Sequence, residues 1–139
     1  MMTASNDAQE LPGTGAGAGA GSPGLPAEAM AAEVSRLLAT PGLPGQSVAA
    51  LRRADSAFDV LDGMLRNGAP VPLRWPVNGD AERHEPVTAL YDAVSESLRE
   101  VGGAARSFVA LRSACALWRR LDAALRAGAP LPEPWQRKR

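Results

Sequence analysis

The sequence predicts an all-α fold, in which a tandem duplication of a helical hairpin gives four main helices related by a pseudo-two-fold axis. Three observations lead to this prediction. Residues 26–75 align with residues 86–135 without a gap, and about 20 of the 50 aligned positions are identical. Apolar residues recur at helical spacing in both copies. Glycine and proline interrupt the periodic stretches at matching positions.

The two copies are most alike at their ends, where LDGMLRNGAPVPLRW aligns with LDAALRAGAPLPEPW. The shared pattern is LDxxLRxGAPxPxxW. A repeat of this length is one structural unit that needs its neighbour to bury an apolar face. We therefore expect the same order in each copy: a helix, a short break, a longer helix, and an extended Pro/Trp arm.

The first 25 residues, MMTASNDAQELPGTGAGAGAGSPGL, are rich in Gly, Ala and Pro. Such a segment buries too little apolar surface to offset the conformational entropy lost on ordering. We expect residues 1–25 to form a disordered tail. A phosphate-binding GxGxxG loop is not indicated, because Ala18 stands where the third glycine would be needed.

The first helix of each copy is expected to begin near Pro26 or Pro86, because the first helical turn does not need the N–H group that proline lacks. Apolar residues then follow at helical spacing. They are Met30, Val34, Leu37 and Leu38 in one copy, and Val87, Leu90, Val94, Leu98 and Val101 in the other. The breaks that follow are expected at residues 41–45 and at Gly102–Gly103.

The longer helices are expected to start at Ser47 and Ser107, which stand where a helix needs an N-cap. Gly68 and Gly128 are expected to end them, in the left-handed conformation that glycine adopts at C′. Each helix has one apolar face. The faces consist of Val48, Leu51, Phe58, Leu61 and Leu65, and of Phe108, Leu111, Cys115, Trp118, Leu121 and Leu125.

The extended arms end in Trp75 and Trp135, and two interpretations of these residues are open. Each indole could fold back over the apolar core as a clasp. Alternatively, each could be exposed as an anchor that binds a protein partner. Duplication does not separate the two, because either use would be copied, so both tryptophans are candidate partner-binding residues.

The remaining segments are a polar linker at residues 76–85 (PVNGDAERHE) and a basic tail at residues 136–139. A single hairpin of this size buries too little surface to be stable alone. We expect the two copies to form one globular domain with a four-helix arrangement. The linker is also long enough for each hairpin to pair with a second chain.

The residues of the 139-residue chain indicate no catalytic centre, metal site or cofactor. Cys115 is the only cysteine and lies on an apolar face, which favours a buried, unreactive thiol. His84 is the only histidine, and its spacing to the linker carboxylates matches no known ligand pattern. No serine stands in a GxSxG sequence. We therefore expect a protein that is not an enzyme.

Positive charge is concentrated near the end of the chain. Residues 101–139 contain 8 cationic and 2 anionic side chains, although the whole chain balances 15 of each. Arg112, Arg119 and Arg126 recur every seventh position. We expect them to pair with an acidic row on the preceding helix, formed by Asp92, Glu96 and Glu100. The alternative is a nucleic-acid-binding face, formed by Arg112, Arg119, Arg120, Arg126, Arg137, Lys138 and Arg139.

The leading functional hypothesis is a small interaction module that binds a protein partner or forms a homodimer. The alternative is a nucleic-acid-associated accessory or regulatory protein that acts through the Arg-rich last helix. A third hypothesis is a small-ligand sensor with a pocket between the two copies. Because no apolar stretch is long enough to span a bilayer, and no signal peptide is indicated, we expect a cytoplasmic protein without a membrane partner.

Overall fold

The computed structural model describes residues 25–136, and this part of the chain is helical and has no strand. Four α-helices and three short 3₁₀ helices follow one another. Their bounds are α1 Leu25–Leu37, η1 Pro44–Gln46, α2 Ser47–Arg66, η2 Ala81–Arg83, α3 Glu85–Leu98, α4 Ala104–Arg126 and η3 Glu133–Trp135. The predicted all-α class with four main helices is confirmed. Apart from Leu25, the predicted N-terminal tail lies outside the described residues.

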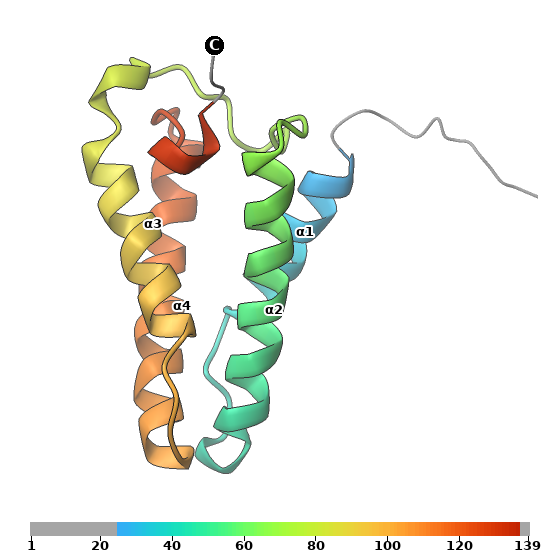
Figure 1. Ribbon diagram of the computed structural model, residues 1–139, viewed down its shortest axis with the longest axis vertical. Coiled ribbons are helices and arrows are strands. Elements are labelled where there is room, and N and C mark those ends of the chain that lie inside the picture. Colours follow the sequence, from blue (N-terminus) through green and yellow to red (C-terminus); the bar gives the residue numbers. More distant parts are fainter. Residues whose placement is uncertain (1–24, 137–139) are drawn as a thin grey trace, which may run out of the picture.

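The helices pack in two antiparallel pairs. α1 contacts α2 and α3 contacts α4, while α2 and α4 lie side by side between them (Figure 1). The segment that joins α2 to α3 crosses one end of the bundle, where η3 also lies (Figure 1). One hydrophobic core takes side chains from all four helices. No helix in this described range is long and apolar enough to cross a membrane.

The predicted apolar faces of α2 and α4 form much of this core. Leu61, Leu121 and Leu125 are fully buried, and burial of such a side chain contributes about 1.5–3 kcal/mol. Three residues that the sequence assigns to apolar faces lie outside this core. Phe108, near the start of α4, is only partly buried. Val48 is 37% exposed in the first turn of α2, and Val101 is 81% exposed because α3 ends before it.

The predicted N-caps, Ser47 and Ser107, are wrong. Ser47 is the first residue of α2, and Ser107 lies inside α4, which starts three residues earlier. Both hydroxyls are buried and donate to backbone carbonyls of the preceding connection, those of Leu43 and Gly102, each at 3.5 Å. These serines therefore face the core instead of closing the helix end.

The predicted helix ends at Gly68 and Gly128 are confirmed. Their φ angles are +86° and +101°, in the left-handed region that favours glycine. In the same turns, the N–H of Ala69 donates to the Met64 carbonyl at 2.9 Å, and that of Ala129 to the Ala124 carbonyl at 3.0 Å. These two hydrogen bonds, each from the sixth residue back to the first, are typical of the Schellman motif. The motif turns the chain away from the helix axis.

Candidate functional site

The candidate partner-binding residues, Trp75 and Trp135, lie in the interior and are 2% and 1% exposed. Their rings stack on each other, with centroids 5.8 Å apart and planes inclined by 12°. Further aromatic rings surround the stack, those of Phe58, Tyr91 and Trp118. In this conformation a partner protein contacts neither indole directly.

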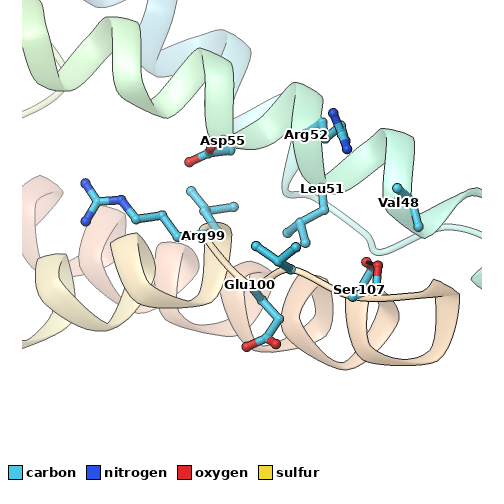
Figure 2. A pocket seen from close by; sticks show the side chains of 10 residues that line it. Val48, Leu51, Arg52, Asp55, Arg99, Glu100 and Ser107 are labelled. Carbon is cyan, nitrogen blue, oxygen red and sulfur yellow. Dashed lines mark hydrogen bonds between the residues drawn. The ribbon is translucent and has the colours of Figure 1, made fainter.

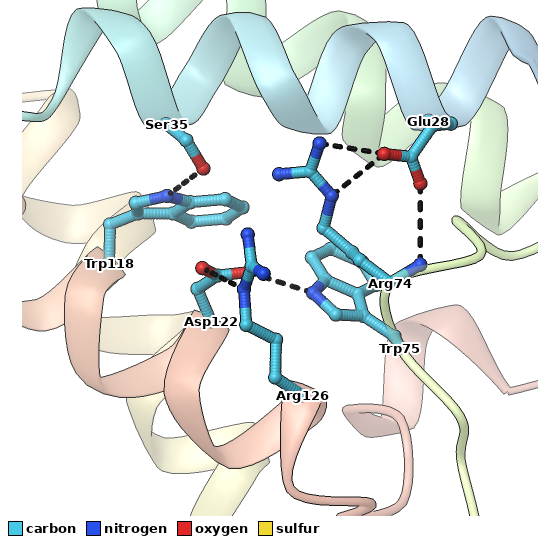
Figure 3. Close-up of polar contacts among 7 residues, drawn as sticks. All are labelled: Glu28, Ser35, Arg74, Trp75, Trp118, Asp122 and Arg126. Atoms are coloured by element: carbon cyan, nitrogen blue, oxygen red, sulfur yellow. Dashed lines mark hydrogen bonds and ion pairs between the residues drawn. The ribbon is translucent and has the colours of Figure 1, made fainter.

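Each indole N–H is held by an aspartate of the other copy of the repeated sequence. Trp75 Nε1 donates to Asp122 Oδ1, and Trp135 Nε1 donates to Asp62 Oδ1, both at 2.8 Å. Figure 3 shows the first of these bonds, between the arm that follows α2 and the helix α4. A hydrogen bond to a charged acceptor contributes about 1.5–3 kcal/mol, so the two bonds tie the halves of the chain together.

Arginines complete the two aspartate sites. Arg66 Nε lies 3.0 Å from Asp62 Oδ2, and Arg126 Nε lies 2.9 Å from Asp122 Oδ2. Acid-before-base pairs at i,i+4 on a helix are ordinarily exposed surface ion pairs. Here the carboxylates are in fact only 11% and 15% exposed, while the arginines remain half-exposed.

Asp62 has a further donor in Tyr91, whose hydroxyl donates to Oδ1 at 2.7 Å and accepts from Arg66 Nη2 at 2.7 Å. Burial and the hydrogen bond to Asp62 raise the pKa of Tyr91 above its ordinary value, against the opposing effect of Arg66. The hydroxyl therefore stays protonated, and its O–H group donates a hydrogen bond to the carboxylate.

The segment that follows α2 is held to α1 by an ion pair. Arg74 Nη2 lies 2.6 Å from Glu28 Oε2, and both side chains are largely buried (Figure 3). Burial alone would raise the pKa of Glu28, but the hydrogen bonds and the charge of Arg74 outweigh it and hold this pKa below its ordinary value. The backbone N–H of Arg74 also donates to Glu28 Oε1 at 3.4 Å, so both the side chain and the backbone next to Trp75 are bound to α1.

Trp118 and a pair of serines distinguish the two halves further. Trp118 Nε1 donates to Ser35 Oγ at 3.0 Å (Figure 3). Ser95 stands sixty positions after Ser35, and its buried hydroxyl has no hydrogen-bond partner within residues 25–136. The residue that aligns with Trp118 is Phe58, which has no N–H group to donate.

The residues considered for chemistry are placed as follows. Cys115 is 3% exposed, and burial raises the pKa of its thiol despite the nearby charge of Arg119. A raised pKa leaves less of the reactive thiolate. A ring nitrogen of His84 lies 2.9 Å from the hydroxyl of Thr88. Among residues 25–136, no group of three or more His, Cys, Asp or Glu side chains lies close enough to hold a metal ion.

The expected pairing of the acidic row of α3 with the arginine row of α4 is wrong. Within the described range, no ion pair joins the two rows, and Glu100 lies instead 3.7 Å from Arg106. The arginines have other neighbours. Arg112 lies over the Phe108 ring, Arg119 reaches the Ala39 carbonyl at 3.5 Å, and Arg126 binds Asp122.

All four candidate nucleic-acid-binding arginines of α4, including Arg120, are exposed. Arg112, Arg119 and Arg120 belong to no ion pair in the described part of the chain. The other three candidates, Arg137, Lys138 and Arg139, lie outside the described residues.

Two open grooves follow the helix pairs. The α1–α2 groove has a volume of about 810 Å³, and the α3–α4 groove has a volume of about 610 Å³. Each contains an exposed valine, Val60 at 47% in the first and Val109 at 62% in the second. Sequence reasoning missed both valines, although each is an apolar residue on the otherwise polar side of its helix.

A smaller cleft of about 280 Å³ lies between α2 and the connection from α3 to α4 (Figure 2).

Comparison of the chain with known protein families, with curated proteins and with solved structures finds no match. Functional inference therefore depends on the surfaces and side chains described above.

Proposed function

We propose that this chain is a non-enzymatic interaction module, built as a tandem duplication of a helical hairpin with pseudo-two-fold symmetry. The reciprocal bonds of Trp75 to Asp122 and of Trp135 to Asp62 support the duplication, because the residues of each pair exchange places on a shift of sixty positions. In this proposal the Pro/Trp arms clasp the two copies into one rigid domain. The helix surfaces then remain free for a partner.

The observation that carries the functional proposal is the α1–α2 groove. Its apolar lining comes from both helices and consists of Met30, Leu37, Ala57 and Val60. Neighbouring helices of this length leave a groove that fits the apolar face of a third helix, with anchors at i, i+3, i+4 and i+7. Exposed apolar surface in a groove rimmed by polar residues is typical of protein-binding sites.

The rim of the groove is positively charged. Arg36 is paired with Glu33, whose carboxylate lies 2.6 Å away, but Arg52 and Arg53 take part in no ion pair formed within residues 25–136. Charge complementarity therefore favours a partner whose apolar residues are flanked by Asp and Glu. We propose that the groove binds an acidic amphipathic helix of a partner protein.

The α3–α4 groove provides an internal comparison. Its charged residues are Glu96, Glu100 and Arg106, so its rim is not basic. An acidic helix gains no charge complementarity there. A substitution in this second groove is therefore a matched control for one in the first.

The proposal is tested by fluorescence anisotropy with a labelled acidic peptide of about five helical turns. The peptide carries Leu at i, i+3, i+4 and i+7, with Glu beside them, and a control peptide carries Lys in place of Glu. The acidic peptide is expected to bind and the basic one not to. Val60→Asp and Arg53→Glu should each weaken binding at least about tenfold, the effect of losing about 1.4 kcal/mol. Val109→Asp should leave it unchanged.

Two results would overturn this occupant. Equal binding of the two peptides would show that the charged rim does not select the partner. Unchanged binding by Val60→Asp would show that the peptide does not bind in the groove. A concentration-dependent dimer in light scattering, lost in Val60→Asp, would identify a second copy of the chain as the occupant instead.

A second candidate function is nucleic-acid binding through α4, and the exposed and unpaired Arg112, Arg119 and Arg120 favour it. Such binding is dominated by phosphate contacts and weakens steeply with salt. The measurement is anisotropy with labelled duplex DNA and with RNA at several salt concentrations. Binding that is lost in the triple Arg→Ala variant would support this function, and absence of binding at low salt would remove it.

A further inference from the structure

The cleft between α2 and the α3–α4 connection combines an apolar lining with charged side chains, of which Arg52, Asp55 and Arg99 belong to no ion pair formed within residues 25–136. Its apolar residues include Leu51 and Leu98, which are almost fully buried, and Val101, which is 81% exposed. A volume of about 280 Å³ is at the small end for ligand pockets and suits a molecule of amino-acid size. The cleft is distinct from the α1–α2 groove of the proposed function, although Arg52 borders both.

Two of these charges have opposite signs, those of Asp55 on α2 and Arg99 just after α3. In Figure 2 they project at the same end of the cleft, from opposite walls. Neither belongs to an ion pair formed within residues 25–136. Glu100 is directed away from α2 in Figure 2 and lies 3.7 Å from Arg106. Asp55 is therefore the lining carboxylate that has no ion pair within residues 25–136, and Arg99 is the guanidinium at its end of the cleft.

Among residues 25–136, no cationic side chain lies within ion-pair distance of Asp55. Burial and the charge of Asp59 raise the pKa of Asp55 above its ordinary value, and Arg99 opposes them only in part. A cationic group bound next to Asp55 would restore the stability of its charged form.

The aligned positions of the other copy have no such cleft chemistry. Asp55 aligns with Cys115, which is buried, and Val48 aligns with Phe108, whose larger ring packs beneath Arg112. The segment η1 also packs against α4. A carboxylate and an open space thus occur together at Asp55, whereas the aligned Cys115 offers no carboxylate.

We propose that this cleft binds a small zwitterion of the α-amino-acid class with an aliphatic side chain. The ammonium group pairs with Asp55, the carboxylate pairs with Arg99, and the side chain lies among Leu51, Leu98 and Val101. An amino acid satisfies both charges at once, since its two groups have the opposite signs to those of the cleft.

The test is a titration of the ¹⁵N-labelled full chain with L-leucine, followed by NMR. The backbone amides of Leu51, Val101 and Gly102 should shift in a saturable manner. Two analogues separate the contacts, because leucinamide lacks the carboxylate and N-acetyl-L-leucine lacks the ammonium group. Each analogue should bind at least about tenfold more weakly, as expected when a charged group in a site loses its partner.

Variants assign each contact. Asp55→Asn should weaken L-leucine at least about tenfold and leave the weak binding of N-acetyl-L-leucine unchanged. Arg99→Met should do the same with leucinamide as the unaffected ligand. Arg120→Met, on the exposed face of α4, is the matched control, and Val60→Asp shows that the result is independent of the groove. Absence of shifts, equal binding of the three ligands, or unchanged affinity in Asp55→Asn would overturn the proposal.

Discussion

The two aspartates of the repeated LDxxLR sequence stand in different surroundings. Among the described residues, Asp62 accepts side-chain hydrogen bonds from Trp135, Tyr91 and Arg66, whereas Asp122 accepts them from Trp75 and Arg126. Tyr91 causes the difference, because the residue that aligns with it is Ala31, which has no donor. A buried carboxylate is costly unless it is paired and hydrogen-bonded.

This comparison teaches that one sequence motif can be stabilised in two ways. The Asp62 site relies on a third donor from α3. The Asp122 site has two donors, and the Glu28–Arg74 ion pair holds the arm beside it to α1. Removal of equivalent residues should therefore have unequal effects on the two halves.

The largest expected effect comes from the indoles. Trp135→Ala and Trp75→Ala should each lower the free energy of unfolding by about 3–5 kcal/mol, the usual cost of truncating a buried aromatic residue. Trp135→Ala should be the more damaging, because it also removes a donor from the more buried aspartate. Guanidinium unfolding followed by circular dichroism measures both. A negligible loss in either variant would mean that its indole is exposed in solution.

The aspartates should rank next. Asp62→Ala leaves three donors without their acceptor and should cost about 3 kcal/mol, while Asp122→Ala leaves two and should cost about 2 kcal/mol. Asp92→Ala, an exposed position of α3, is the control and should stay within about 0.5 kcal/mol of the parent chain. A larger loss of unfolding free energy in Asp122→Ala than in Asp62→Ala would show that Tyr91 does not add to the stability of the Asp62 site.

The aligned serines give a smaller contrast. Ser35→Ala removes the acceptor of the Trp118 N–H group and should cost about 1 kcal/mol, whereas Ser95→Ala removes a buried hydroxyl without a partner and should be neutral or stabilising. Thermal unfolding compares the two. Equal losses would show that Ser95 has a bonding partner in solution.

The smallest effect should be seen in the pH dependence of stability. Because the pKa of Asp55 is raised in the folded chain, its contribution is fully present below about pH 3.9 and is lost as pH rises through the raised pKa. Asp55→Asn should therefore raise the unfolding midpoint at pH 7, and this gain should shrink as the pH approaches 4.

Glu28 should show the opposite sign. Its pKa is lowered, so its stabilising contribution is present at pH 7 and is lost as pH falls through the lowered pKa. Glu28→Gln should reduce stability at pH 7. Unfolding curves for both variants across this range measure the signs, and matching pH profiles would contradict the assignment.

Much of the fold could be predicted from the sequence, because it depends on local features. Helical periodicity predicted the buried faces of α2 and α4, and Gly68 and Gly128 predicted their ends through a conformation that glycine favours. Local reasoning failed at Ser47 and Ser107, whose hydroxyls bond to carbonyls of the preceding connection. The acidic and basic rows also failed to meet, because the arginines find nearer partners.

The candidate sites were less predictable, because they depend on packing between distant segments. The repeat identified Asp62 and Trp135 as shared positions, but no spacing rule shows that an indole binds the aspartate of the other copy. The cleft at Asp55 depends on the course of residues 99–103 and on a valine in place of a phenylalanine. Val60 and Val109 left a signal, since each is an apolar residue away from the buried face of its helix.

The reciprocal clasp between the two halves is tested most directly by double-mutant cycles on unfolding free energy. Trp135→Phe combined with Asp62→Ala, and Trp75→Phe combined with Asp122→Ala, should each show a coupling of about 1 kcal/mol or more, because the phenyl ring lacks only the N–H donor and leaves most of the packing. The crossed combinations, Trp75→Phe with Asp62→Ala and Trp135→Phe with Asp122→Ala, should show coupling near zero. Stronger coupling in the crossed combinations would contradict the account, since it would place each tryptophan against the aspartate of its own copy.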